Sequence, residues 1–402
     1  MNARASARSR RSLAEVVHSR EMIVVCGSGG TGKTTVSAAL GVLAATTSSA
    51  RVLVLTVDPA RRLATALGLG GGELAGQAPV KVEREVFTAL GVECPGELWV
   101  AMLDTKAGWD ELVRRHAPSD DVARRLLANP LYTNITGRFV NSHDYIAMEQ
   151  LHALHESGEY DLVVIDTPPS RRALDLLDAP ARMREFFGGR LITWLTIPSR
   201  SRLAAAAAKP FTAVADRVLG SRFLADIAEF FTLFGTMEEG FVERALAVEA
   251  LLADERTGFV VVTTSEPSPS REARHLVVEL GRRSLGLGAV VMNRTLPDGL
   301  RGRAATEVAA SLRSPDEAAA LAAVLAPLIE PGSVDRAGLE ESLAHVLVET
   351  GERVGELQVA AAREAECRRM LEQVAPVVIP LPALRGDASG LASLVALAKS
   401  LA

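Results

Sequence analysis

The sequence predicts an α/β fold: a doubly wound, mostly parallel sheet with an inserted helical subdomain. Three observations support this prediction, namely strand-length apolar runs, helix-like stretches between them, and a glycine-rich turn directly after the first run. Each run is apolar at nearly every position, as in strands that helices cover on both faces. The runs are Met22–Cys26, Val52–Val57, Leu98–Leu103, Leu162–Ile165, Phe259–Thr264, Ala289–Met292 and Val377–Ile379. Their alternation with helical segments favours parallel strands joined by crossover helices.

Composition and charge exclude several function classes. The net charge of −5 comes from interspersed acidic and basic residues, so there is no clustered basic face and we expect no nucleic-acid partner. No apolar run approaches the roughly 18–20 residues that a membrane-spanning helix needs, and we expect a cytoplasmic protein. Cys26, Cys94 and Cys367 are far apart and form no C-x-x-C pair, which argues against a disulfide framework and a cysteine-rich zinc site.

The chain divides into a short tail and one large domain. The first residues are rich in arginine, and no apolar segment follows as an export signal would require, so we expect residues 1–20 to be a disordered basic tail. Residues 21–402 are expected to form one domain. Helical blocks at about 104–160 and 171–256 are too long for simple crossovers and predict the inserted subdomain. A third segment, at about 304–373, predicts two or three surface helices before the last strand.

A glycine-rich segment follows the first apolar run and precedes a predicted helix over Thr34–Ala45, which is the context that a phosphate-binding loop requires. The residues that match the pattern G-x-x-x-x-G-K-[ST] are Gly27, Ser28, Gly29, Gly30, Thr31, Gly32, Lys33 and Thr34. Glycine lets backbone N–H groups surround phosphate oxygens, and the helix N-terminus adds a favourable dipole. Lys33 is expected to reach the β- and γ-phosphates, and the Thr34 hydroxyl to ligate Mg²⁺. The sequence therefore predicts a P-loop ATPase that uses ATP and Mg²⁺, with a nucleotide site extending to Thr35, rather than a chance glycine-rich turn.

Two other predicted strands end in an aspartate. Leu162–Asp166 has the Walker B pattern, and its carboxylate is expected to contact Mg²⁺ through a water molecule; the alternative is a cap for the following helix. Val54–Asp58 ends in a carboxylate that, beside a phosphate loop, orients the attacking water; the alternative is a plain turn aspartate. The expected catalytic residues are Lys33 and Asp58, and the expected metal-site residues are Thr34, Asp58 and Asp166.

These three motifs together resemble the ArsA-like ATPases, a family that includes arsenite-efflux ATPases and the guided-entry ATPases that target tail-anchored membrane proteins. The resemblance is strongest at Cys26–Thr35, Val57–Leu67 and Asp161–Leu177. The phrases D-P-A-R-R-L at 58–63 and D-T-P-P-S-R at 166–171 resemble the actinobacterial branch, called anion-transporting ATPases. The resemblance implies a Mg²⁺-dependent ATPase that couples ATP binding and hydrolysis to dimer opening and closing, and so energises a membrane transport partner or handles a client protein.

The resemblance also implies roles for single residues. It places Asp58 in the first switch as the residue that positions water, and Asp166–Thr167 in the second switch. Asn293 matches the family asparagine that reads the adenine edge, although a turn residue is the alternative. The segment Pro380-Leu381-Pro382 resembles the loop that packs on the adenine face.

The chain departs from the family pattern at the second loop position. The family loop reads G-K-G-G-V-G-K-T, and its first lysine reaches the partner subunit's site in a dimer; here that position is Ser28. A homodimer is therefore expected to be slow, because such a cation contributes about 10³–10⁵ in rate. We favour a heterodimer with a lysine-bearing paralogue over two alternatives: substitution by an arginine of this chain, or poor hydrolysis. The candidate arginines are Arg61, Arg62, Arg171 and Arg172.

Two further departures concern metalloid chemistry. Ser170-Arg171-Arg172 replaces the T-G-H of the family's second switch, which removes any metalloid contact made by that histidine. The cysteines are not clustered as thiolate ligands of As(III) or Sb(III) would be, so we expect no arsenite site. The dimer-bridging zinc of some guided-entry members is expected to be missing for the same reason.

One apolar stripe marks the second helical block. Its residues recur three or four apart, as on one face of a helix: Phe223, Ile227, Phe230, Phe234, Met237 and Phe241. Core packing is the simplest interpretation, and a groove for a client's membrane helix is the alternative.

Two other function classes remain open. A MinD- or ParA-like positioning switch is usually smaller, and the end of this chain lacks a basic amphipathic helix. A nucleotide-binding scaffold with negligible hydrolysis is suggested by Ser28. Comparing turnover with and without Asp58→Asn separates the scaffold from the ATPase, since a scaffold has no hydrolysis to lose.

Overall fold

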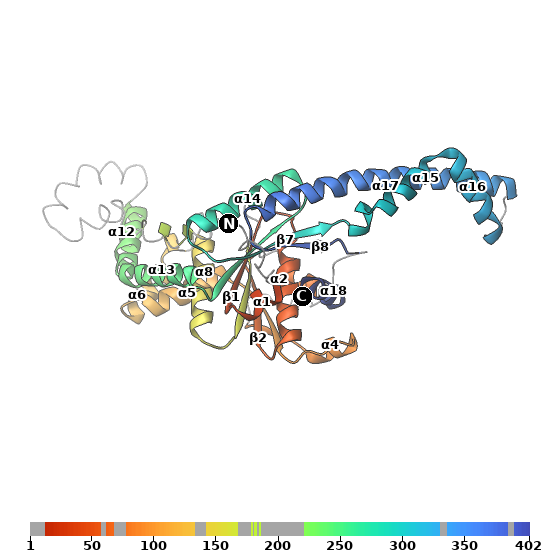
Figure 1. Cartoon of the computed structure of the whole chain (residues 1–402). Helices are drawn as coiled ribbons and strands as arrows, with labels where there is room; N and C mark the ends of the chain where they lie inside the picture. The colour runs from red at the N-terminus through yellow and green to blue at the C-terminus, as the bar shows by residue number, and fades with distance from the viewer. Residues whose placement is uncertain are drawn as a thin grey trace, which may run out of the picture.

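An eight-stranded sheet with helices on both faces forms the centre of the structure (Figure 1). This computed structural model describes residues 13–57, 62–67, 78–132, 142–167, 178–179, 181–182, 185, 221–329, 336–384 and 390–402. The strand order is β3-β4-β2-β5-β1-β6-β7-β8, and all neighbours are parallel except β3 and β4. The predicted doubly wound, mostly parallel α/β fold is confirmed.

The strands coincide with the apolar runs of the sequence. Their bounds are β1 Met22–Cys26, β2 Arg51–Thr56, β3 Val80–Val82, β4 Glu97–Met102, β5 Leu162–Asp166, β6 Thr257–Thr263, β7 Leu287–Thr295 and β8 Val378–Pro382. Only β3 was not predicted, because its three residues include a lysine and form too short an apolar signal. It lies at the edge of the sheet, where it pairs with one neighbouring strand, β4.

Strand side chains alternate between two apolar cores, one on each face of the sheet. In β1, Ile23 and Val25 belong to the first core, and Met22 and Val24 to the second. This two-sided burial is the reason that the strands are apolar at nearly every position. The first core is covered by α1 (Leu13–His18), α2 (Lys33–Thr47), α3 (Arg62–Leu67), α4 (Arg84–Ala89) and α18 (Leu391–Leu401). The second is covered by α8 (Ser142–Glu156), α13 (Glu238–Ala253), α14 (Pro267–Arg282) and the end of α17 (Arg336–Glu372).

Helix α2 is enclosed along most of its length. Every residue from Val36 to Ala45 is buried. The strands β1, β2, β4 and β5 contact it from the sheet side, while α1, α3 and α18 pack on its other sides. The helix that follows the glycine-rich loop is therefore fixed in position by packing rather than by helix propensity.

Residues 13–20 differ from the expected disordered tail. They begin with helix α1, whose Leu13, Val16 and Val17 are buried in the first core. The spacing of three and four between these apolar residues gives the helix one core-facing side, which the arginine-rich composition concealed. Residues 1–12 lie outside the described part of the chain.

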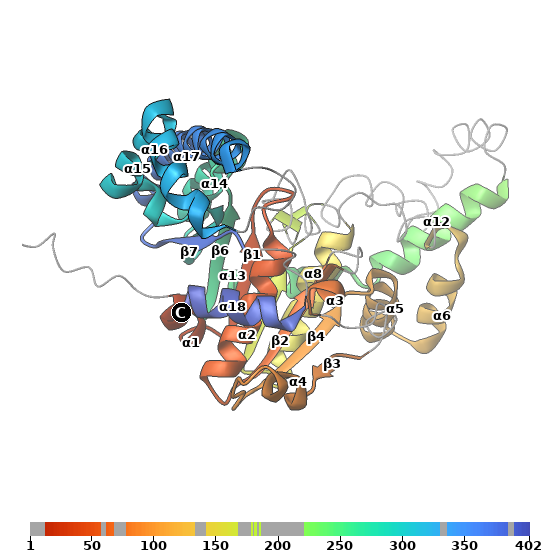
Figure 2. The same ribbon diagram turned by 90° about the vertical axis from the view of Figure 1, so that its right-hand side faces the viewer.

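A helical lobe packs at the end of the sheet that carries β3 and β4 (Figure 2). Its described helices are α5 (Thr105–His116), α6 (Asp120–Ala128), α12 (Ser221–Gly235) and parts of α8 and α13. The apolar stripe is divided between α12 and α13, and not carried by one helix as expected. Phe230, Phe234, Met237 and Phe241 are buried in this lobe's own core, around Trp109. The core interpretation is confirmed for these four residues. Ile227 is half-buried, and the side chain of Phe223 lies outside the described part.

A second group of helices extends away from the opposite end of the sheet (Figure 1). It consists of η1 (Asp298–Arg301), α15 (Arg303–Arg313), α16 (Pro315–Leu325), η2 (Ala326–Leu328) and α17, which has 37 residues. We call α15, α16 and the part of α17 beside them the arm. α15 and α16 pack along α17, whose C-terminal part reaches α14, β7 and β8. Among the described helices, including α17, none has the combination of length and hydropathy needed to cross a membrane.

A candidate nucleotide-binding site

The glycine-rich loop connects the central strand β1 to α2 and requires glycine at two positions. Gly27 has a φ of 145°, and a Cβ there would lie 2.1 Å from the carbonyl oxygen of Val262 on β6. Gly32 has a φ of 91°, and a Cβ there would lie 2.2 Å from Nδ2 of Asn293 on β7. Any other residue would be strained at either position and would push the loop away from its neighbours. The motif glycines therefore set the path of the backbone.

Lys33 is folded back over the loop. Its Nζ atom donates to the carbonyl oxygens of Gly27 and Ser28, both at 3.0 Å, and the residue is 6% exposed. The Thr31 hydroxyl donates to the same Ser28 carbonyl at 2.9 Å. The ammonium is thus held against the backbone carbonyls of the loop.

The expected metal-site residues Thr34 and Asp166 are in direct contact. The Thr34 hydroxyl donates to Oδ2 of Asp166 at 2.7 Å, and the Thr56 hydroxyl at the end of β2 donates to the same atom at 3.0 Å. Asp166 is fully buried at the carboxyl end of β5, between β1 and β2. A buried carboxylate beside a hydroxyl supplies the hard oxygen ligands that Mg²⁺ prefers, so these residues fit the ion.

Asn293 lies beside the loop at the end of β7. Its Nδ2 atom donates to the Thr31 carbonyl at 2.8 Å, and its Oδ1 atom accepts from the Arg294 amide at 2.9 Å. Arg294 has a φ of 59°, and the pairing of β7 with β8 shifts at this point. The resulting bulge turns Asn293 toward the loop and Arg294 outward. Asn293 is therefore part of the loop's surroundings, and its contact with adenine stays a prediction.

The segment at 380–382 is a strand end, and not the expected loop. Pro380 and Leu381 belong to β8, and Leu381 is paired with Asn293 across the sheet. The Leu381 side chain is fully buried in the first core, against α18 and its neighbours. Parallel pairing with β7 explains the difference, since it extends the sheet to this residue. Contact of Leu381 with a nucleotide would have to be made by its backbone.

Asp58 lies outside the described residues, as do Arg61, Arg171 and Arg172; the side chain of Arg62 does too. The last described residue before Asp58 is Val57, whose amide donates to the Asp166 carbonyl oxygen at 3.0 Å. Val57 therefore lies beside the expected metal-site residue Asp166. Thr167 follows Asp166, and its hydroxyl donates to the Val25 carbonyl at 2.8 Å.

Two residues of the site were not predicted. Thr56 contacts Asp166 because β2 and β5 are neighbours in register, and strand order cannot be read from one sequence. Glu272 on α14 accepts a hydrogen bond of 2.5 Å from the Ser28 hydroxyl. It lies far from the loop in sequence and outside any motif. Because Thr56 is a polar residue at the end of an apolar run, the sequence could have indicated that it belongs to the site. No sequence pattern could have indicated this for Glu272.

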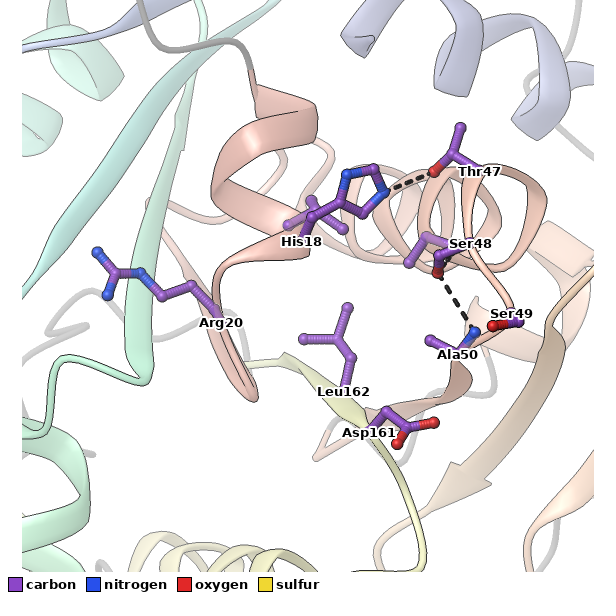
Figure 3. A pocket seen from close by; sticks show the side chains of 10 residues that line it. His18, Arg20, Thr47, Ser48, Ser49, Ala50, Asp161 and Leu162 are labelled. Carbon is purple, nitrogen blue, oxygen red and sulfur yellow. Dashed lines mark hydrogen bonds between the residues drawn. The ribbon is translucent and has the colours of Figure 1, made fainter.

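A surface pocket of about 390 Å³ lies at the opposite end of α2, by the amino ends of β2 and β5 (Figure 3). His18 and Thr47 are joined across its rim by a hydrogen bond of 2.9 Å, and Asp161 lies on its other side. The length of α2 separates this pocket from Lys33 and Asp166. It is therefore distinct from the candidate nucleotide-binding site.

Cys26, the last residue of β1, is expected to be unreactive in the folded protein. Burial raises the pKa of its thiol to about 12, although Lys33 opposes the shift. Burial also raises the pKa of Cys94, which is only half-buried. At pH 8, Ellman's reagent should modify Cys94 first and Cys26 only as the protein unfolds, because the thiolate is the reactive form. Mass spectrometry of the labelled peptides measures this order, and early labelling of Cys26 would contradict it.

Fold and site together define the class of this protein. A glycine-rich loop between the central strand and a buried helix, with a strand-end aspartate bonded to the loop's threonine, is the arrangement of a P-loop NTPase. The chain belongs to the ArsA ATPase family, described as anion-transporting ATPases, whose sequence profile matches residues 20–307.

Similar proteins agree with this membership. The chain is 31% identical over 281 residues to an uncharacterized protein of Streptomyces coelicolor, which covers 69% of this chain and 63% of that protein. This chain therefore spans less than two thirds of the length of the Streptomyces protein. It is 24% identical over 299 residues to an ATPase ASNA1 homolog of Trypanosoma cruzi, covering 70% of this chain and 77% of the relative. An ATPase ASNA1 homolog of Leishmania braziliensis is 29% identical over 197 residues, or 44% and 48% of the two chains.

Proposed function

We propose that this chain is a Mg²⁺-dependent ATP hydrolase that binds nucleotide at Gly27–Thr35 and uses ATP turnover to open and close a dimer. The observation that carries the proposal is the contact between Thr34 and Asp166, at 2.7 Å, beside the loop that encloses Lys33. A loop threonine bonded to a strand-end carboxylate is the ligand pair that holds the metal of a bound nucleotide in this class. Family membership supports the same activity.

Each residue of the proposed site has a separate task. Lys33 supplies the cation within the loop, and the loop amides bind the phosphate oxygens. Thr34 and Asp166 would hold Mg²⁺, which when bound neutralises developing charge on the phosphates. Asp58 positions the attacking water, and Asn293 binds the adenine edge. Catalysis in this scheme comes from positioning and charge, since phosphoryl transfer needs little covalent chemistry from the protein.

The second part of the proposal concerns the composition of the dimer. Ser28 donates its hydroxyl to Glu272 of the same chain and carries no positive charge, so this chain cannot supply a loop cation to a partner's site from that position. We propose that a paralogue with lysine at this position completes a heterodimer. The output would be work on a membrane transport partner or a client protein.

Replacing Asp58 by asparagine tests the activity. ATP affinity should stay within about threefold, while turnover should fall by about 100-fold or more, because a positioned carboxylate contributes 10²–10⁴ in rate. Asp120→Asn, in the first turn of α6, serves as the matched control. Calorimetry measures binding, phosphate release measures turnover, and light scattering after gel filtration should show an ATP-bound dimer accumulating in the variant.

Two outcomes would change the conclusion. Unaltered turnover in Asp58→Asn would remove that residue from the mechanism. Binding without any turnover, in the wild type alone and with a lysine-bearing paralogue, would favour the scaffold function that Ser28 suggests.

A further inference from the structure

Two connections lead from the glycine-rich loop to one turn of α17, and each consists of two hydrogen bonds joined by a short stretch of backbone. The first starts at Thr31, whose carbonyl accepts from Asn293 at 2.8 Å. Directly after β7, the Leu296 amide donates to Oε2 of Glu364 on α17 at 3.0 Å. Asn293 and Glu364 are 8% and 3% exposed, so both side chains of this connection are buried. A displacement of the loop at Thr31 is thereby linked to the end of β7 and to α17.

The second connection passes through α14. Ser28 in the loop donates to Glu272, and two residues earlier on the same helix the Ser270 hydroxyl contacts the thiol of Cys367 at 2.9 Å. Ser270 and Cys367 are 7% and 5% exposed. α14 begins soon after β6, the strand that pairs with β1, so its first turns lie beside the loop. This connection is independent of the first until both reach α17.

Both connections end on adjacent positions of the same helix face. Glu364 and Cys367 are three residues apart, and they lie between the buried residues Ala361 and Leu371 on the side of α17 that faces the body. A carboxylate on an otherwise apolar face is costly to bury unless its partners satisfy it. A hydrocarbon side chain at position 364 would avoid this cost. Stability alone therefore does not explain the buried polar contacts of Glu364.

This turn of α17 lies at the base of the arm and is the pivot about which the arm would rotate. Towards its N-terminus, α17 runs for about 46 Å from Cys367 to Arg336, at 1.5 Å per residue. A rotation of about 5° at the pivot therefore moves the far end by about 4 Å. Gly351 lies where α17 meets α15 closely, since a Cβ there would be 2.8 Å from the Arg313 amide nitrogen. Such close packing makes α15 and α17 move as one body.

We propose that the arm is a nucleotide-responsive output element, and that Glu364 and Cys367 are the positioning residues that couple it to the loop. The family profile ends at residue 307, so the arm lies almost wholly beyond the matched part of the chain. The inference rests on nucleotide binding at the loop, as proposed above. Coupling is reciprocal, so holding the arm in one position also changes nucleotide affinity.

A distance measurement across the full chain tests this inference. Spin labels on genetically encoded residues at Val324, 67% exposed on α16, and Val86, 45% exposed on α4, report the position of the arm relative to the body. The mean distance should change by about 4 Å or more when Mg²⁺ and a slowly hydrolysed ATP analogue are added. Calorimetry on the same labelled sample confirms that the analogue is bound.

Variants then assign the coupling. E364Q with C367A should lose the nucleotide-dependent change in distance while still binding the analogue. E366Q, which alters an exposed carboxylate on the same turn, should keep it. If circular dichroism shows that the buried double variant is poorly folded, E272Q provides a second route. It alters only the exposed end of the α14 connection and should reduce the change.

Two results would overturn the inference, and a third would overturn the proposed function on which it rests. An unchanged distance in wild type with the analogue bound would show that the arm is not an output element, while leaving the proposed ATPase intact. A full change in both E364Q/C367A and E272Q would remove the positioning role. Absence of binding in calorimetry would instead contradict the proposed function itself.

Discussion

Replacing Lys33 by methionine should abolish measurable binding of Mg²⁺-ATP. The side chain is almost fully buried in the loop, where its ammonium donates to two loop carbonyls. Hydrogen bonds to charged groups contribute about 1.5–3 kcal/mol each, so losing contacts to two phosphates should weaken affinity by at least about 100-fold. Isothermal titration calorimetry measures the change.

The control for this variant is Lys106→Met, which removes an exposed lysine of α5. It should bind like the wild type. Thermal unfolding shows whether Lys33→Met remains folded, because the two loop carbonyls lose a donor and the loop is expected to loosen. A folded Lys33→Met protein that binds Mg²⁺-ATP normally would exclude the loop as the nucleotide site.

Asp166→Asn should remove the Mg²⁺ dependence of nucleotide binding. The wild type should bind ATP more tightly with Mg²⁺ than with EDTA, whereas the variant should bind equally in both. Asparagine keeps the volume of the fully buried aspartate and can still accept from the hydroxyls of Thr34 and Thr56. It lacks the charge that a divalent ion requires. Turnover should fall by about 100-fold or more, because the metal stabilises charge in the transition state.

A matched control lies at the other end of the same strand. Asp161 precedes β5 and accepts from the Arg51 amide, far from the loop. Asp161→Asn should keep the full response to Mg²⁺. If Asp166→Asn responds to Mg²⁺ as the wild type does, the metal is held elsewhere.

The fold was predictable because its signal is local. Strands such as β1 and β5 are buried on both faces and are therefore apolar at consecutive positions. The glycine-rich loop carries its own pattern, and the helix that the pattern predicts directly after the loop begins at Lys33. Helix α1 was missed because arginines before Leu13 dominated the composition of the first 20 residues, while only three apolar residues specify the helix.

The remaining parts of the site depend on contacts between distant segments. Thr56 reaches Asp166 only because β2 lies beside β5, and Glu272 reaches Ser28 only because α14 begins beside the loop. Leu381 became a strand residue through pairing with Asn293. The local sequence pattern predicts none of these three contacts, because each results from the order and register of the strands.

The enclosure of α2 has a consequence for the thermodynamics of binding. A loop anchored to a helix that is packed on all sides has already lost most of its conformational freedom before a ligand arrives. Little ordering entropy then opposes association at the loop itself. The larger rearrangements that accompany binding should arise in segments outside α2, to which small displacements of the loop are passed on, and the heat capacity change on binding should report on those segments.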